Sequence, residues 1–235
     1  MKRIVRIAAL ALCLMLIAST AFAYPPEFLI YHGSREEKRI AITVDDIYDA
    51  DVLRQMHDLC LEYDVPITWF VLGSQIRDSD KEIWESIIAN GGEIGNHSWK
   101  HPYLARIKAH TARNQILLTQ ERIDELLGYH YPLRLLRPPF GNYKEGDVNR
   151  LDLFYEYGVE KTIMWDVSNT DPYGAFEDTQ NGSILLFHTN YTDLECLKVL
   201  IPMLLEDGYE LVTVSDLLYL EPLQTSEEKY VFPYR

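Results

Sequence analysis

Short apolar runs and longer segments with helical spacing alternate along the chain. The run at residues 40–44 is rich in β-branched residues and has the composition of a buried strand. Between Asp49 and Tyr63, by contrast, apolar residues recur every three or four positions, as on one face of a helix. The same reasoning along the chain predicts strands at 28–32, 39–44, 67–72, 93–96, 133–136, 162–165, 184–187 and 210–213, and helices at 49–63, 81–90, 108–127, 147–157, 193–206 and 215–219.

Strands that alternate with helices are typical of α/β proteins, in which helical crossovers join parallel strands. About seven such units predict a closed or nearly closed (β/α) barrel. No internal repeat and no Pro/Gly/Ser-rich linker divides the chain, so a single domain is expected. In barrels of this type the chemistry lies at the C-terminal ends of the strands.

The N-terminus has the pattern of a cleavable signal peptide. Three basic residues stand among the first six, residues 7–17 are apolar, and Ala21 and Ala23 place small residues where a signal peptidase cuts. The apolar run is short for a membrane-spanning helix. We therefore expect removal of residues 1–23, export to the cell envelope or the medium without stable membrane insertion, and one domain over residues 24–235.

The remaining chain is strongly acidic. Without the first 23 residues it has 19 basic and 36 acidic residues, a net charge of −17. Such a surface argues against nucleic acid as a partner and against tight binding to anionic lipid, and a neutral or amino-sugar polymer is a better match. Cys60 and Cys196 also remain, and the sequence leaves open whether they form a disulfide or stay as buried free thiols.

Two adjacent carboxylates, Asp45 and Asp46, follow the strand expected at 39–44. Neighbouring acids repel each other and lose solvation when they are buried, so a fold that places them together needs a counter-charge. A divalent cation is the commonest solution. The alternative is that one of the two acids caps the following helix, and the pair alone does not decide between these interpretations.

Other expected strands also end in residues suited to metal binding or proton transfer. His97 and His101 have the i, i+4 spacing that metal sites use if the segment is helical, although two unrelated surface histidines would show it too. Arg137 opens a rigid Pro-Pro-Phe-Gly loop, Asp171 follows a further strand, and His188 ends an apolar run. Because these strand ends meet at one rim of a barrel, we expect one site there.

On these residues the chain resembles the polysaccharide deacetylases of carbohydrate esterase family 4, whose NodB-like domain is a distorted (β/α) barrel. The resemblance covers roughly residues 39–218 and implies a catalytic core of that extent. The histidine motif His-Ser-x-x-His is unchanged and highly specific. The segments that carry the resemblance are Thr43-Val44-Asp45-Asp46, His97-Ser98-x-x-His101, Arg137-Pro138-Pro139-Phe140-Gly141, Leu186-Phe187-His188 and the closing strand at 208–213.

The resemblance implies a metal site. Asp46, His97 and His101 would hold one divalent ion and leave coordination positions open for water and substrate. Zinc is the first candidate, and cobalt, nickel or manganese would suit the same ligands. The ion would lower the pKa of a bound water, which attacks the acetyl carbonyl that the ion polarises.

The resemblance also implies the residues of proton transfer. Asp45 would be the general base, held ionised and oriented by Arg137. The backbone N–H of Phe140 would help to stabilise the oxyanion. His188 would protonate the leaving amine, and Asp171 would orient His188 and support its charged form.

Two departures from the family pattern concern the loops of the site. Ile47 replaces the glycine that usually follows the paired acids. The fourth motif, usually Asp-x-x-Asp-Trp, has Ser168 in place of the first acid and Pro172 in place of the tryptophan, which normally lines the acetyl pocket. Three aromatic residues are candidates to replace that tryptophan: Trp99, Trp165 and Tyr173.

The sequence therefore predicts a secreted, metal-dependent hydrolase that removes N-acetyl groups from amino sugars in a cell-wall or extracellular glycan, with peptidoglycan or a chitin-like polymer as substrate. One alternative keeps the chemistry and changes the bond, as in an O-acetyl esterase acting on a polysaccharide such as acetyl-xylan. The other is a non-catalytic glycan-binding module on the same scaffold. Intact Asp45, Arg137 and His188 argue against the module, because binding alone needs neither a base nor an acid.

Overall fold

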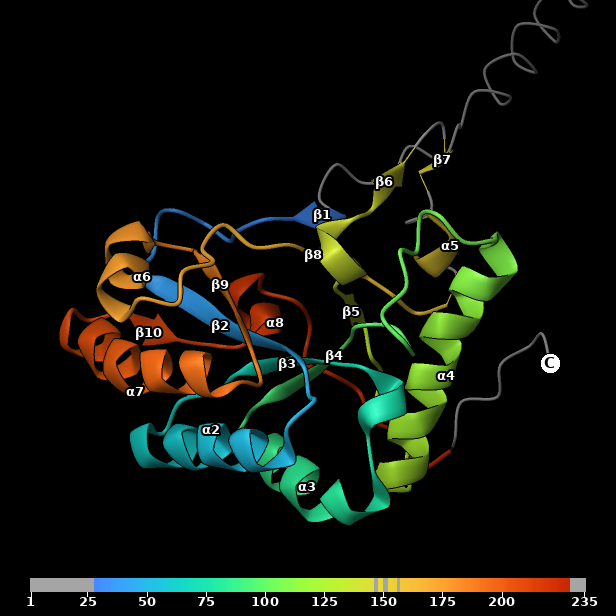
Figure 1. Ribbon diagram of the computed structural model, residues 1–235, viewed down its shortest axis with the longest axis horizontal. Coiled ribbons are helices and arrows are strands. Elements are labelled where there is room, and N and C mark those ends of the chain that lie inside the picture. The colour runs from blue at the N-terminus through green and yellow to red at the C-terminus, as the bar shows by residue number, and fades with distance from the viewer. Residues whose placement is uncertain (1–27, 146–147, 150–151, 156, 229–235) are drawn as a thin grey trace, which may run out of the picture.

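A computed structural model of the chain describes residues 28–145, 148–149, 152–155 and 157–228 (Figure 1). The signal peptide expected at 1–23 lies outside the described residues. The described chain forms a parallel sheet that curves into a distorted barrel, with helices packed around it. The predicted fold class, an α/β barrel with parallel strands, is confirmed.

In the described part of the chain, eight strands make up the main sheet, in the order β1, β8, β5, β4, β3, β2 and β10, with β9 also paired to β2. All of these pairings are parallel. Isolated bridges from His32 to Ser183 and from Val167 to Leu185 connect the β1 and β8 side of the sheet to β9. The strands are β1 (Leu29–Ile30), β2 (Arg39–Asp46), β3 (Thr68–Val71), β4 (Glu93–Asn96), β5 (Leu135–Leu136), β8 (Lys161–Ile163), β9 (Ile184–His188) and β10 (Glu210–Leu211).

Strand β2 lies at the centre of this arrangement. Every residue of it after Arg39 is buried, and β3 and β9 flank it. The apolar residues Ile40, Ile42 and Val44 are fully buried. A strand buried on both faces has a continuous apolar run instead of an alternating one, which is the pattern that this stretch shows.

The helices pack around the sheet, and several of them begin at side-chain caps. For example, the Asp49 side chain accepts hydrogen bonds from the N–H groups of Asp51 and Val52, and Asp64 ends the same helix in a left-handed conformation. The helices are α2 (Ala50–Tyr63), α3 (Lys81–Ala89), α4 (Ala109–Leu127), α5 (Asp152–Tyr155), α6 (Pro172–Asp178), α7 (Tyr191–Glu206) and α8 (Val214–Leu217), with short 3-10 turns at Gly73–Gln75, Asp78–Asp80 and Pro139–Gly141.

The structure differs from the predicted elements in two places. The helix expected at 147–157 is wrong in its first part, because β6 (Lys144–Glu145) and β7 (Val148–Asn149) pair as antiparallel strands. A Gly-Asp dipeptide separates these two strands in the sequence, and such dipeptides favour tight hairpin turns. Helix α6 was not predicted, although Pro172 is well suited to a first helical position.

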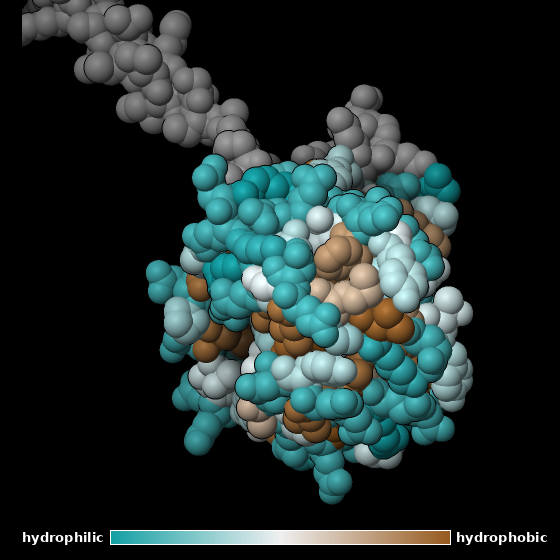
Figure 2. Space-filling model, turned by 90° about the vertical axis from the view of Figure 1, so that its left-hand side faces the viewer, coloured by the Kyte–Doolittle hydropathy of each residue, from teal (hydrophilic) through white to brown (hydrophobic). Residues whose placement is uncertain are grey.

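Other properties of the described chain bear on the sequence predictions. Cys60 and Cys196 are free and buried, so they are packed thiols and not a disulfide. No helix in the described ranges is both long enough and apolar enough to span a bilayer. The face over the helices at the left of Figure 1 is mainly hydrophilic with scattered apolar side chains (Figure 2), as expected for so acidic a chain.

Candidate active site

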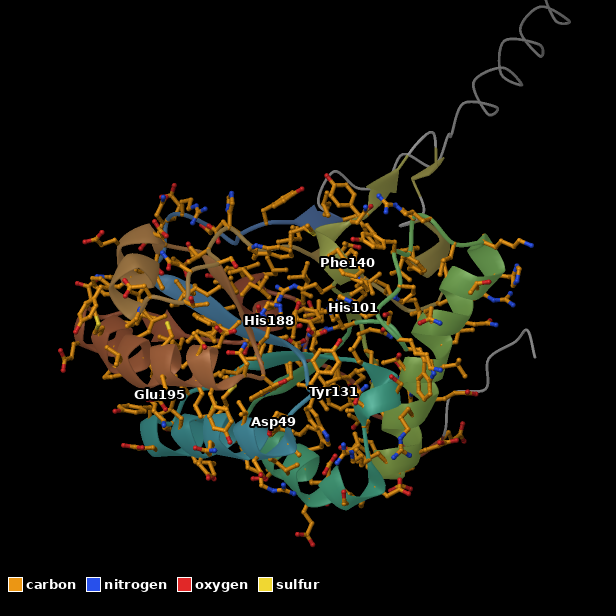
Figure 3. All side chains as sticks on the ribbon, viewed as in Figure 1. Asp49, His101, Tyr131, Phe140, His188 and Glu195 are labelled. Atoms are coloured by element: carbon orange, nitrogen blue, oxygen red, sulfur yellow. The ribbon has the colours of Figure 1, made fainter. Side chains whose placement is uncertain are left out.

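The two central strands bring an acid and a histidine to the same rim of the barrel. Asp45 lies near the end of β2, and the parallel register of β2 with β9 pairs it with His188, the last residue of β9. After Asp45 the backbone turns sharply, because Asp46 and Ile47 both have positive φ, 77° and 78°. Figure 3 shows His188, His101 and Phe140 in the middle of the molecule, where they line one pocket.

Arg137 is the buried counter-charge of Asp45. Its Nη1 donates hydrogen bonds to Asp45 Oδ1 at 2.8 Å and to Thr43 Oγ1 at 2.6 Å. Its Nη2 donates to the carbonyl oxygen of Met164 at 3.0 Å, and the guanidinium also lies over the ring of Phe70. Arg137 is completely buried and Asp45 is 2% exposed, so the pair is fully desolvated. The predicted contact of these two residues is confirmed, whereas the part that Thr43 plays was not predicted.

His97 is fixed in one tautomer. Its Nδ1 lies 2.7 Å from the backbone carbonyl oxygen of Arg137. Because a carbonyl only accepts hydrogen bonds, Nδ1 carries the proton and Nε2 presents its lone pair. Burial lowers the pKa of His97, which also favours the neutral ring. Metal-binding histidines characteristically have such a partner on their second nitrogen.

Asp46, His97 and His101 form a cluster whose geometry and chemistry suit a divalent metal. One ligand atom from each lies within 4.8 Å of the others. Asp46 Oδ1 is 3.6 Å from His97 Nε2 and 3.7 Å from His101 Nε2, and the two nitrogens are 3.1 Å apart. Asp46 Oδ1 is buried and has no hydrogen-bond partner among the described residues. A buried, unpaired carboxylate oxygen facing two imidazoles fits a His₂-carboxylate metal site.

The electrostatics of this cluster agree with that assignment. Burial, and then the charge of Asp45, raise the pKa of Asp46 above its usual range. Burial, and then the charge of His97, lower the pKa of His101. The raised pKa shows that the charged form of Asp46 lacks a compensating positive charge, and the lowered pKa values favour neutral histidine rings with a lone pair to offer. A cation that binds there would remove the penalty on the buried carboxylate.

The turn that carries the two histidines is not helical, so the conditional helical interpretation of their spacing is wrong. Ser98 and His101 both have positive φ, 74° and 57°. Asn96 Oδ1 accepts a hydrogen bond from the Ser98 N–H, and Ser98 Oγ accepts one from the His101 N–H. This irregular turn folds back on itself and brings the two rings to a centroid separation of 4.9 Å.

Phe140 is one of the residues that line the same pocket. It has φ 62° within the 3-10 turn Pro139–Gly141, and two preceding prolines restrict the loop. N–H groups in the first turn of a helix have no partner within that helix. The Phe140 ring stacks on Tyr103 at 4.0 Å and contacts the His101 ring at 4.3 Å. The fold therefore brings Arg137 and Phe140 together with the Asp46, His97 and His101 cluster, as predicted.

Asp171 does not make the predicted contact with His188 among the hydrogen bonds and ion pairs of the described chain. Its Oδ2 accepts a hydrogen bond from the Gly174 N–H at 2.7 Å, so it caps α6. Asp193 contacts His188 instead: its Oδ2 accepts from the His188 N–H at 2.6 Å and lies 3.6 Å from Nδ1 of the ring. The sequence contained one signal for this, since Asn190 and Asp193 have the spacing of a helix cap.

These groups enclose a pocket of about 270 Å³. Its apolar wall includes Leu186 and Trp165, so of the three aromatic candidates Trp165 is the one that lines this pocket. Trp99 instead packs against Gly73, and Tyr173 is 63% exposed on α6. The complete lining is Asp45, Asp46, His97, His101, Pro138, Phe140, Gly141, Trp165, Leu186 and His188.

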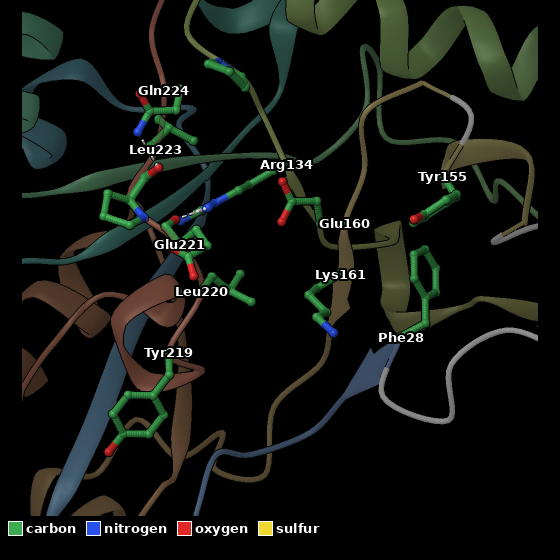
Figure 4. Close-up of a pocket in the computed structure, with 12 residues that line it drawn as sticks. Phe28, Arg134, Tyr155, Glu160, Lys161, Tyr219, Leu220, Glu221, Leu223 and Gln224 are labelled. Carbon is green, nitrogen blue, oxygen red and sulfur yellow. Dashed lines mark hydrogen bonds between the residues drawn. The ribbon is translucent and has the colours of Figure 1, made fainter.

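A larger cavity of about 740 Å³ lies at the opposite end of the barrel, near the starts of β5 and β8 (Figure 4). Arg134 lines it, but its guanidinium is occupied: Nε donates to Ser215 Oγ and Nη1 donates to the Glu221 carbonyl. None of the catalytic candidates lines this cavity. The catalytic candidates are therefore gathered at the smaller pocket.

Comparison with known proteins agrees with this placement. Residues 32–159 match the polysaccharide deacetylase family. The peptidoglycan-N-acetylmuramic acid deacetylase PdaC of Bacillus subtilis is 31% identical over 77% of this chain and 39% of the relative. The solved PdaC structure superposes with a TM-score of 0.66 over 78% of this chain and 91% of that chain, at 30% identity.

Two further proteins define the range of these similarities. A peptidoglycan-N-acetylglucosamine deacetylase of Bacillus cereus is 28% identical over 85% of this chain and 73% of the relative. BA3943 of Bacillus anthracis, a pseudoenzyme of carbohydrate esterase family 4, is 23% identical and superposes with a TM-score of 0.71 over 82% of this chain and 69% of that chain. Because active and inactive proteins share this fold, activity has to be argued from the site.

Proposed function

This chain belongs to the polysaccharide deacetylase family, and from that premise we propose that it is a secreted, metal-dependent deacetylase that hydrolyses N-acetyl groups of amino sugars in a cell-wall glycan. One observation carries the proposal. Asp45, paired with the buried Arg137, and His188 line the same small pocket as the Asp46, His97 and His101 cluster. A base, an acid and a set of metal-ligating residues around one cavity are what metal-assisted amide hydrolysis uses.

Asp46, His97 and His101 are the residues that would hold the metal. When bound, a divalent ion supplies Lewis acidity toward the acetyl carbonyl and makes water a better nucleophile. Zinc suits this donor set best, because two imidazoles and one carboxylate leave a position open in its usual geometry. Cobalt, nickel and manganese fit the same ligands.

The other residues divide the proton transfers between them. Asp45 takes a proton from the attacking water, and Arg137 keeps the Asp45 carboxylate oriented for that task. The N–H of Phe140 donates to the oxyanion that develops on the acetyl oxygen. His188 protonates the leaving nitrogen, so that acetate and a free amine are released. Leu186 and Trp165 form an apolar wall against which an acetyl methyl group packs.

The substrate class is supported by the relatives. The two matched deacetylases are named for N-acetylmuramic acid and N-acetylglucosamine in peptidoglycan. This chain spans 39% of the length of the first relative and 73% of the second, so their substrates are a proposal for this chain. Its acidic character also favours a product polymer that gains an ammonium group for each acetyl group lost.

Acetate release tests the proposed function. Residues 24–235 loaded with zinc are incubated with acetylated chitooligomers, peptidoglycan and acetyl-xylan, with and without a chelator, and the Asp45→Asn variant is run in parallel. We expect chelator-sensitive release from the first two substrates, reduced by at least about a hundredfold in Asp45→Asn. Release from acetyl-xylan alone would make the protein an O-acetyl esterase, and metal binding without any acetate would support the non-catalytic module.

Export has a separate test. The full chain is expressed in a bacterium that secretes proteins through signal peptides, and the N-terminus of the extracellular product is sequenced. We expect it to start at Tyr24, because Ala21 and Ala23 precede that bond. An uncleaved chain retained in the cells would contradict the proposed location.

A further inference from the structure

Asp193 contacts His188 at two points. Its Oδ2 accepts a hydrogen bond from the His188 backbone N–H at 2.6 Å and lies 3.6 Å from Nδ1 of the ring. The start of α7 holds this carboxylate in place, because the Asp193 N–H donates to Asn190 Oδ1 at 2.9 Å and Asn190 Nδ2 donates back to Asp193 Oδ2 at 3.1 Å. An anchored carboxylate therefore lies beside one particular nitrogen of His188.

The burial of these two residues is unequal. The Asp193 side chain is 3% exposed, whereas the His188 side chain is 45% exposed. A buried carboxylate needs hydrogen bonds and positive charge around it. The N-terminus of α7 supplies partial positive charge, and a protonated His188 supplies a full one. The side-chain contact with Asp193 is the main cause of the raised pKa of His188, and burial of the ring opposes it.

Other charges around the pocket act on the same ring. Asp45 and Asp46 at the end of β2 also raise the pKa of His188. The charge of His188 in turn lowers the pKa of both His97 and His101, which follow β4. Among the ion pairs of the described residues, the acid that pairs with the His188 ring is Asp193, at Nδ1, whereas Asp45 and Asp46 line the pocket.

The residue that the family resemblance places in this role, Asp171, does not occupy it here. Asp171 uses Oδ2 to cap α6 at Gly174. The position beside Nδ1 of His188 is instead taken by an acid from a different element, five residues further along the chain from His188.

We propose that Asp193 is the positioning residue of His188: it holds the Nδ1 side of the ring, so that Nε2 points into the pocket and delivers its proton to the leaving nitrogen. This inference rests on the proposed deacetylase function. In the step concerned, water oxygen adds to the acetyl carbon and Asp45 takes the water proton. The C–N bond then breaks, its electron pair stays on nitrogen, and nitrogen takes the proton from Nε2 of His188.

If Asp193 only capped α7, its replacement would weaken the cap and would have no specific effect on His188. The chain offers a matched control for this case. Asp216 occupies the same position in α8 that Asp193 occupies in α7. Its N–H donates to the side chain of the N-cap residue Thr213, and its carboxylate accepts from the same hydroxyl. Asp216 does not line the catalytic pocket. Asp216→Asn therefore measures the effect of weakening a cap without touching His188.

The test compares substrates that differ in their need for an acid. An acetylated chitooligomer releases an amine, which must be protonated, whereas 4-nitrophenyl acetate releases a phenolate that leaves without a proton. Zinc-loaded wild type, Asp193→Asn and Asp216→Asn are assayed on both. We expect Asp193→Asn to lower kcat on the amide at least about tenfold with little change in KM, and to change ester hydrolysis less than about twofold. Asp216→Asn should alter neither.

Equal losses on both substrates in Asp193→Asn, or no loss on the amide, would overturn the inference. A second measurement does not depend on activity: the His188 ring is titrated by NMR in the metal-free wild type and in Asp193→Asn. We expect a lower His188 pKa in the variant, and an unchanged value would also overturn the inference. If wild type hydrolyses neither substrate while this titration shifts as expected, the deacetylase function fails and the contact of Asp193 with His188 stands.

Discussion

The backbone carbonyl of Arg137 accepts a hydrogen bond from His97 Nδ1 at 2.7 Å, while the guanidinium of the same residue binds Asp45 Oδ1 at 2.8 Å. One residue thus fixes the tautomer of a metal ligand through its main chain and the orientation of the base through its side chain. A substitution at Arg137 therefore removes the contact with Asp45 and leaves in place the backbone carbonyl that holds His97.

Replacing Arg137 with methionine is expected to destabilise the protein strongly. The change leaves Asp45 buried without its counter-charge, which costs about 3–5 kcal/mol in the free energy of unfolding. Urea unfolding of the metal-free protein measures this loss. Arg35→Met is the control, since Arg35 and Asp166 form a partly exposed pair whose loss should cost below about 1 kcal/mol.

The double variant Asp45→Asn/Arg137→Met tests whether the cost arises from the unpaired charge. We expect it to be more stable than Arg137→Met alone, with a coupling of at least about 1 kcal/mol between the two positions. Additive losses would show that the guanidinium acts through its contacts with Thr43 and Met164 instead.

Removing a metal ligand should abolish stabilisation by metal. A ligand at about a hundred times its dissociation constant stabilises a protein by about 2.7 kcal/mol, so zinc should raise the melting temperature of the wild type. Asp46→Ala should lose most of that increase. Asp45→Asn changes the adjacent carboxylate, which is not a proposed ligand, and should keep it. The same response to zinc in both variants would contradict the assignment of Asp46 as the ligand.

The pH dependence of the amide reaction should report His188. The acid form of His188 is needed, and its pKa is raised above the ordinary value of about 6.5, chiefly by Asp193. Activity should therefore fall as the pH rises through this raised pKa. The pH profile of kcat/KM measures this decrease, and His188→Gln should remove the decrease together with most of the activity. If kcat/KM still decreases with rising pH in His188→Gln, the titration belongs to another group.

The same pKa shift has a consequence for stability. Because the folded pKa of His188 is raised, its contribution to stability is complete below about pH 6.5 and is lost as the pH rises through the folded value. The ring is nearly half exposed, so this contribution is small. The activity profile is therefore the more sensitive measurement.

Replacing Ile47 with glycine should destabilise the protein less than such a change usually does at a buried position. It has φ 78°, which is strained for a β-branched residue, yet its side chain is only 6% exposed. Truncation to alanine should cost about 2–5 kcal/mol through lost packing. A variant with alanine is usually more stable than the same variant with glycine, by about 0.5–1 kcal/mol in the free energy of unfolding. Here Ile47→Gly should be at least as stable as Ile47→Ala, because glycine relieves the strained φ.

The matched control for this prediction is Ile94, which is buried in β4 and is not among the residues with positive φ. There Ile94→Gly should be less stable than Ile94→Ala, and denaturant unfolding of the four variants compares the two orders. The same order at both positions would show that the turn at Ile47 stores no strain. The hydrogen bonds from the N–H groups of Ile47 and Tyr48 to Thr189 Oγ1 would then be what holds this loop.

The sequence alone determined the α/β barrel, the strand ends that carry chemistry and most of the candidate site. Buried parallel strands such as β2 are continuous apolar runs, and polar residues that follow such runs must lie at one rim. Asp45, Asp46, His97, His101, Arg137, Phe140 and His188 were therefore predictable from local patterns and family motifs.

Only the tertiary structure decided which residues touch across that rim. The acid beside His188 comes from α7 and not from the loop that holds Asp171, and the aromatic wall is Trp165 and not Trp99. The histidine turn is irregular because Ser98 and His101 adopt left-handed conformations that their neighbours stabilise. Such choices depend on the packing of segments distant in sequence, and local hydrophobic periodicity carries no information about which of two nearby acids reaches a given ring.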